Sequence, residues 1–122
     1  MGVFTAAGKN ALLNEIDGLG WFAAPFNGDP SGGGTELSGS TTEGRIALTG
    51  KLAAAAAGSV ANNAALLWTA TASITIDHVA IYSAASEGVL LGRASVDSTA
   101  RTSGQEVTFE PGDLDFSLTD PV

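Results

Sequence analysis

A single histidine limits the imidazole chemistry open to this 122-residue sequence. Any Ser–His–Asp arrangement or imidazole metal site must include His78, and the neighbouring Asp77 makes an acid–base pair conceivable. Both residues lie inside a run of strand-forming residues, and we interpret His78 as structural. The sequence has no cysteine, so no thiol or second imidazole can complete a zinc or iron site. We therefore expect no catalytic residue and no metal ligand.

The segment 44-GRIALTGK-51 resembles a phosphate-binding loop at first sight. Five residues separate its two glycines where the motif needs four, and Leu52 stands where a Ser or Thr would ligate magnesium. We interpret this segment as a strand, and we expect no nucleotide or other cofactor.

Asp113, Asp115 and Ser117 alternate as the ligands of a calcium loop do. Leu118, however, stands where such a loop needs its sharply turning glycine, and no closing glutamate follows. The alternation instead places the three polar residues on the solvent face of a strand. A weak calcium site built from acids distant in sequence stays open.

The charge of the chain argues against nucleic acid as a partner. Thirteen acidic residues against five basic residues give a formal net charge of −8, which repels nucleic acid and anionic lipid. This negative charge either keeps the protein in solution or offers an acidic face to a basic partner. Residues 1–25 contain charged residues and a proline but no continuous apolar run, so we expect neither a signal peptide nor a membrane span.

One helix is predicted near the N-terminus, over residues 5–17. Thr5 is a suitable N-cap, the following alanines and leucines favour helix, and Gly18 supplies a stop. The apolar stripe of this helix consists of Leu12, Leu13 and Ile16.

Short strands are predicted for most of the remaining chain. The first includes Trp21, Phe22 and Phe26, and Pro25 confines it to a sheet edge or a strand end. The alanine run over 52–57 is bracketed by glycines that leave room for about two helical turns, so we expect it to be extended. Further strands are expected over 45–50, 64–71, 73–83, 89–96, 106–110 and 114–118, with a turn at 84–88 and a loop at 97–105.

The strand over 73–83 has an interrupted alternation. Ile74 and Ile76 lie on one face, whereas Val79 and Ile81 fall on the other unless a residue is inserted near Asp77 and His78. A β-bulge there would place all four apolar side chains on the core face.

Residues 27–44 form a long predicted loop that is rich in Gly, Ser and Thr. Loops of this length in compact domains are usually functional or disordered, so we expect contact with a partner here. The candidate contact residues are Asn27, Gly28, Asp29, Pro30, Glu36 and Leu37.

These elements predict one mainly β domain over residues 1–122, an antiparallel, jelly-roll-like β-sandwich with one N-terminal helix. Short strands at intervals of about eight to twelve residues with Gly and Pro between them are typical of such folds. Small residues dominate the apolar set, which suits thin layers of packed sheet.

Five segments carry a resemblance to a known family: residues 5–18, 21–39, 53–68, 76–96 and 107–118. The segment over 76–96 is its most recognisable hairpin, in which an apolar strand ends in an aromatic residue, turns through small residues and returns through a Leu-Gly pair. With these five segments in this order along the sequence, the chain resembles a family of small tailed-phage virion proteins of the tail fibre or minor tail protein type.

The resemblance implies a non-enzymatic structural protein of a virion, assembled in the host cytoplasm. It implies other virion proteins as partners, a homo-oligomer or multi-copy assembly, and possible contact with the host surface, with neither nucleic acid binding nor membrane insertion. An alternative is a head decoration protein bound to the major capsid protein. A remote alternative is a carbohydrate-active enzyme that uses His78 or Asp115.

Overall fold

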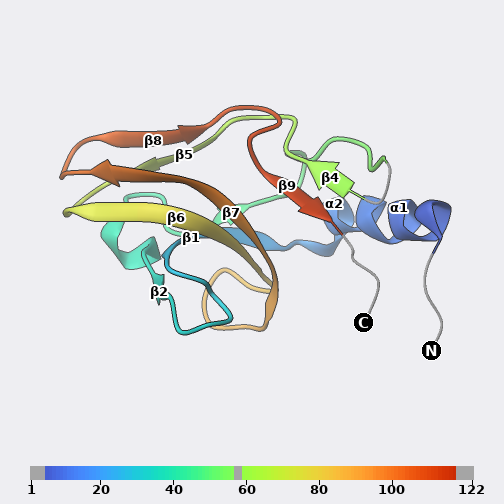
Figure 1. The fold of residues 1–122 in the computed structure, drawn as a ribbon, viewed down its shortest axis with the longest axis horizontal. Coiled ribbons are helices and arrows are strands. Elements are labelled where there is room, and N and C mark those ends of the chain that lie inside the picture. The colour runs from blue at the N-terminus through green and yellow to red at the C-terminus, as the bar shows by residue number, and fades with distance from the viewer. Residues whose placement is uncertain (1–4, 57–58, 118–122) are drawn as a thin grey trace.

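The computed structural model describes residues 5–56 and 59–117, and its strands form two layers (Figure 1). One layer is an antiparallel sheet with the order β2–β1–β6–β7, in which β3 also pairs with β1. Its strands are β1 (Phe22–Asn27), β2 (Thr35–Glu36), β3 (Ile46–Ala47), β6 (Ile74–Tyr82) and β7 (Leu90–Arg101).

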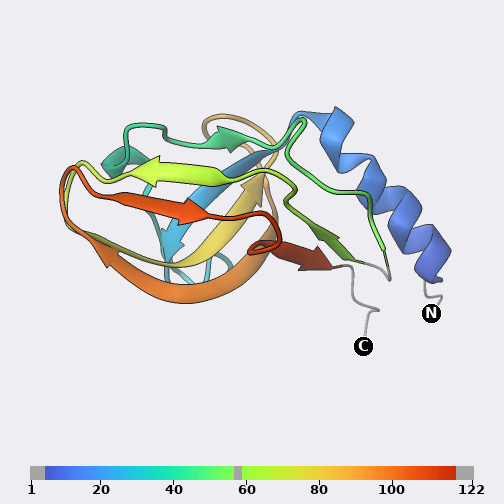
Figure 2. The same cartoon turned by 90° about the horizontal axis from the view of Figure 1, so that it is seen from above.

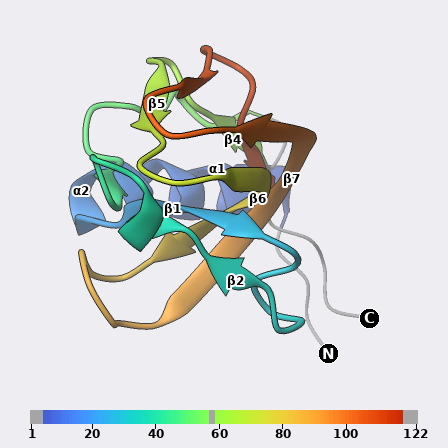
Figure 3. The same cartoon turned by 90° about the vertical axis from the view of Figure 1, so that its left-hand side faces the viewer.

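The second layer contains two antiparallel strand pairs, β4 with β9 and β5 with β8. The strands are β4 (Ser59–Ala61), β5 (Leu66–Thr69), β8 (Glu106–Phe109) and β9 (Asp115–Ser117). Viewed along the molecule, β5 lies above the diagonal sheet of β1, β6 and β7 (Figure 3). The predicted fold class, a mainly β, antiparallel sandwich with an N-terminal helical segment, is confirmed.

The helical segment lies at one end of the layers (Figure 2). The predicted N-cap is confirmed, because the Thr5 hydroxyl accepts a hydrogen bond from the Gly8 N–H at 3.1 Å, and α1 spans Ala6–Asn14. A four-residue helix α2 (Ile16–Leu19) follows, and the stop is Gly20 rather than Gly18. Gly20 has a φ of 71°, a left-handed conformation that favours glycine at a helix end.

The prediction that Pro25 confines β1 to an edge or a strand end is wrong, because β1 lies inside the sheet. Pro25 is opposite Val79 of β6, and on its other side its carbonyl accepts a hydrogen bond from the Leu37 N–H at 2.8 Å. The amide nitrogen and carbonyl of a strand residue point to the same side. The nitrogen of Pro25 therefore faces the gap between β2 and β3, where no ladder hydrogen bond is lost.

The ladder between β6 and β7 is irregular at the predicted place, between Ile76 and His78, but the extra residues belong to β7 and not to β6. Two steps along β6, from Ile76 to His78, match four steps along β7, from Thr99 to Ser95. At the same place the large buried apolar side chains of β6 change from even-numbered to odd-numbered positions. As predicted, all four apolar side chains of β6 lie in one buried cluster: Ile74, Ile76, Val79 and Ile81.

Three other predictions need correction. The predicted loop over 97–105 belongs in part to β7, because residues 99–101 pair with Ile74–Ile76 although the segment has no apolar alternation. The predicted loop over 27–44 contains β2 and a 3-10 turn at Ser38–Ser40. The predicted strand over 45–50 shrinks to β3, since a turn begins after the buried Leu48. The alanine run is not helical over residues 53–56, as predicted, and Ala57 lies outside the described residues.

Trp68 lies at the centre of the core and has no exposed surface. Its indole N–H donates to the Gly44 carbonyl at 2.6 Å, and its ring meets that of Phe109 edge to face, with centroids 5.8 Å apart. Trp21, by contrast, is only half-buried and packs against this core from outside.

Asn62 is a polar side chain inside this core, with 2% of its surface exposed. Its amide group donates to the carbonyls of Ala64 and Glu110 at 2.9 and 3.0 Å. Its oxygen accepts from the N–H groups of Gly112 and Leu114 at 3.1 and 3.0 Å. A single buried amide therefore fixes the turn that connects β8 to β9.

Candidate interaction site

The loop that follows β1 turns back through a glycine-rich stretch. We call residues 27–37 the anchored loop. Gly28 and Gly33 have φ angles of 88° and 91°, and a Cβ on Gly34 would lie 2.4 Å from the Gly28 carbonyl oxygen. The turn therefore requires glycine at the point where its two arms meet. Three polar contacts then attach this loop to the rest of the molecule.

The first attachment joins Gly28 to β6. The Asp77 carboxylate accepts a hydrogen bond from the Gly28 N–H at 2.7 Å, and its same oxygen lies 2.9 Å from Nδ1 of His78. These two contacts lower the pKa of Asp77, with the hydrogen bond to His78 the larger cause. The carboxylate at the bulge thus holds the start of the anchored loop.

The second attachment joins Asp29 to β7. The Asp29 carboxylate accepts from the Ser31 N–H and hydroxyl, each at 2.9 Å, and from the Arg93 guanidinium at 2.8 Å. Arg93 also contacts the Ser31 hydroxyl. The hydrogen bonds from Ser31 and then the charge of Arg93 lower the pKa of Asp29. This contact is solvated, because both charged side chains are about half exposed.

The third attachment is a more buried ion pair between Glu36 and Arg45. Two parallel hydrogen bonds of 2.8 Å join the guanidinium to the carboxylate, and the Arg45 side chain is only 7% exposed. Arg45 also donates to the carbonyls of Ala84 and Glu87, and its charge lies 3.8 Å from the centre of the Tyr82 ring. The hydrogen bonds from Arg45 lower the pKa of Glu36. Arg45 therefore joins the anchored loop to the turn between β6 and β7.

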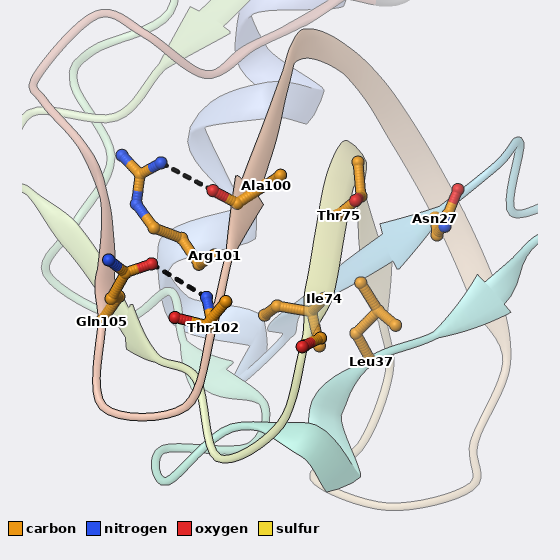
Figure 4. A pocket seen from close by; sticks show the side chains of 9 residues that line it. Asn27, Leu37, Ile74, Thr75, Ala100, Arg101, Thr102 and Gln105 are labelled. Atoms are coloured by element: carbon orange, nitrogen blue, oxygen red, sulfur yellow. Dashed lines mark hydrogen bonds between the residues drawn. The ribbon is translucent and has the colours of Figure 1, made fainter.

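A surface pocket of about 350 Å³ opens beside the anchored loop (Figure 4). Leu37 and Ile74 lie near its middle, with Asn27 and Thr75 on one side and the turn after β7 on the other. In that turn the Gln105 side chain accepts from the Thr102 N–H at 2.9 Å. The pocket thus surrounds a small apolar centre with amide and hydroxyl groups, which suits hydrogen bonding to a polar partner surface.

The six predicted contact residues have two different roles in this structure. Asn27 and Leu37 line the pocket, whereas Gly28, Asp29 and Glu36 form the attachments of the loop. Pro30 is half-buried within the glycine-rich turn. Sequence reasoning missed the pocket residues contributed by β6, β7 and the following turn, which are Ser73, Ile74, Thr75, Ala100, Arg101, Thr102 and Gln105. No local pattern marks them, because only the pairing of β6 with β7 brings them to the loop.

His78 does lie between an acid and a hydroxyl, since its Nε2 is 3.4 Å from the Ser95 hydroxyl. Asp77, the acid of this set, also holds the Gly28 N–H, and Asp115 accepts a hydrogen bond from Ser59 at 2.8 Å. Both carboxylates therefore connect separate elements of the fold. Within the described residues, no group of three or more His, Cys, Asp or Glu side chains could hold a metal ion. No helix in residues 5–56 and 59–117 is long and apolar enough to span a bilayer.

A family model described as podophage GP4 fiber I protein gp80 matches residues 5–117, whereas no curated protein matches the chain. The match covers most of the sequence and confirms the resemblance to phage fibre proteins. It also confirms that the chain is a component of the virion and has a tail-associated structural role. This chain therefore belongs to the family of the podophage GP4 fiber I protein gp80.

Proposed function

We propose that this chain is a tail fibre subunit that assembles with other virion proteins, in more than one copy, and presents the anchored loop and its pocket to the host surface. The family match supports the fibre role rather than head decoration. The observation that carries the proposed contact is the set of three attachments, which hold the loop while Asn27 stays exposed beside the pocket. A contact surface that is fixed before binding loses less conformational entropy when it binds.

We propose further that the chain acts without catalysis. The acids that an enzyme would use, Asp77 and Asp115, are engaged in contacts that connect strands and loops. The pocket beside the anchored loop is lined by amides, hydroxyls and one guanidinium, and it has no carboxylate in its lining. This composition supports binding rather than acid–base chemistry.

Binding of the fluorescently labelled chain to host cells tests the proposed contact. The Asn27→Arg variant places a long charged side chain at the pocket, and Thr108→Arg is a matched control because Thr108 is exposed on β8. We expect Asn27→Arg to weaken binding about tenfold, equivalent to about 1.4 kcal/mol, while the control binds like the unaltered chain. Equal binding by the two variants, or no binding by the unaltered chain, would overturn the proposed host contact.

A further inference from the structure

An apolar groove of about 310 Å³ lies between the helical segment and β7, away from the anchored loop's pocket. The exposed large apolar side chains of the described residues are Leu12, Leu19, Val89 and Leu91, and all but Val89 line this groove. Its other large apolar lining residues are Leu13, Trp21, Ile81 and Phe116. Apolar side chains gathered in this way mark a protein contact surface more often than scattered ones do.

The strand beside the groove has a free edge. β7 is the last strand of its sheet, and no described strand pairs with its outer edge (Figure 2). The Pro25 carbonyl points away from β6, so the backbone N–H and C=O of Val79, which lies opposite Pro25, point toward β7. Ala94 lies opposite Val79 on β7, and its backbone N–H and C=O therefore point toward β6. The backbone groups of Arg93 and Ser95 then point outward, and Arg93 also lines the groove.

The charges on this surface favour a copy of the same chain over an acidic or basic partner. The groove lining contains one acid, Glu15, and one base, Arg93, which also binds Asp29 of the anchored loop and keeps half of its side chain exposed. In a two-fold contact the same patch occurs on both partners, so the groove of one copy meets charges of both signs on the other. The second copy also supplies Leu91 for the groove and a free strand edge for the outward backbone groups.

We propose that this surface, the apolar groove with the adjoining edge of β7, is the contact between two copies of the chain. The inference rests on the proposed fibre function and names the surface by which the subunits associate. Leu91 is the exposed large apolar side chain that belongs both to the groove lining and to β7.

Sedimentation equilibrium of the purified chain at up to about 100 μM tests the proposal, since a micromolar Kd is then saturated. We expect a dimer or larger assembly for the unaltered chain. The variants Leu91→Glu and Leu19→Glu place a carboxylate in the contact from two different elements, and each should weaken association about 100-fold. Thr108→Glu adds the same charge on the exposed face of β8 and should associate like the unaltered chain. Thermal unfolding verifies that each variant is folded.

A charge exchange tests whether the surface meets its own copy. Glu15→Lys and Arg93→Glu should each weaken association, and the double variant should recover it at least in part. Asp29→Asn removes only the contact between the anchored loop and Arg93, and it should associate like the unaltered chain. An assembly that persists in both leucine variants would overturn this surface and leave the proposed multi-copy function intact. A monomeric unaltered chain would overturn both the surface and the self-assembly that the proposed function includes.

Discussion

Two ion pairs of the anchored loop differ in burial and allow a matched test of what holds the loop. In the Glu36–Arg45 pair the side chains are 28% and 7% exposed, whereas in the Asp29–Arg93 pair they are 44% and 50% exposed. A buried bidentate pair should stabilise the folded state measurably, and an exposed pair contributes little because water and salt screen it.

The perturbation is a double-mutant cycle with Arg45→Met, Glu36→Gln and both together. Hydrogen bonds to charged groups contribute about 1.5–3 kcal/mol each, and partial exposure of Glu36 reduces this, so we expect a coupling of about 2 kcal/mol. Arg45→Met alone should cost more, about 3–4 kcal/mol, because two carbonyls and the Tyr82 ring also lose their partner.

Guanidinium unfolding followed by tryptophan fluorescence measures these free energies, since Trp68 is fully buried in the folded state. The same cycle with Asp29→Asn and Arg93→Met serves as the control, and its coupling should be indistinguishable from zero. A coupling for the Glu36–Arg45 pair that is no larger than the control would refute the reasoning that this pair holds the loop.

Three further predictions concern stability. Asn62→Leu leaves the buried Leu114 N–H without its partner and should lower the free energy of unfolding by about 2–4 kcal/mol. In the same denaturation assay, the control Asn63→Leu at the exposed neighbouring residue should lower it by less than about 1 kcal/mol. Gly34→Ala should lower the melting temperature well below that of Gly39→Ala, because a Cβ at residue 34 meets backbone at 2.4 Å and one at residue 39 meets nothing within 4 Å. Asp77 of β6, which holds the anchored loop, has a lowered pKa in the folded state, so the unfolded state binds more protons in acid. Stability should be level above about pH 5 and fall as the pH drops through about 4. A flat profile in an acid titration of the melting temperature would contradict this.

Local sequence pattern was sufficient for the elements in which one face is apolar. The phase change across Asp77 and His78 predicted where the ladder becomes irregular, since four β-branched residues had to share one face, but it did not predict that the extra residues lie in β7. Thr5 as an N-cap was equally readable, because capping depends on neighbours along the chain.

The errors occurred where tertiary pairing decides the structure. The C-terminal part of β7 has no large apolar side chain, and it is a strand only because β6 lies beside it. Pro25 was excluded from the sheet interior by a rule that holds when the partner strand is continuous, but here β2 and β3 leave a gap at that residue.

The candidate site was predicted only in part for a similar reason. Loop length and glycine content indicated residues 27–44 as a contact region, and Asn27 and Leu37 do line a pocket. The ion pairs that hold the loop join residues between 9 and 64 positions apart in sequence, so no local pattern could reveal them. The opposite wall of the pocket could not be predicted either, because its residues reach the anchored loop only through the pairing of β6 with β7.

Immunogold labelling of the virion that carries this chain tests the central claim most directly, with antibody raised against the purified chain. The account predicts gold particles along the tail-associated fibres and none above background on the head. Label confined to the head would contradict the account and would support a decoration protein instead.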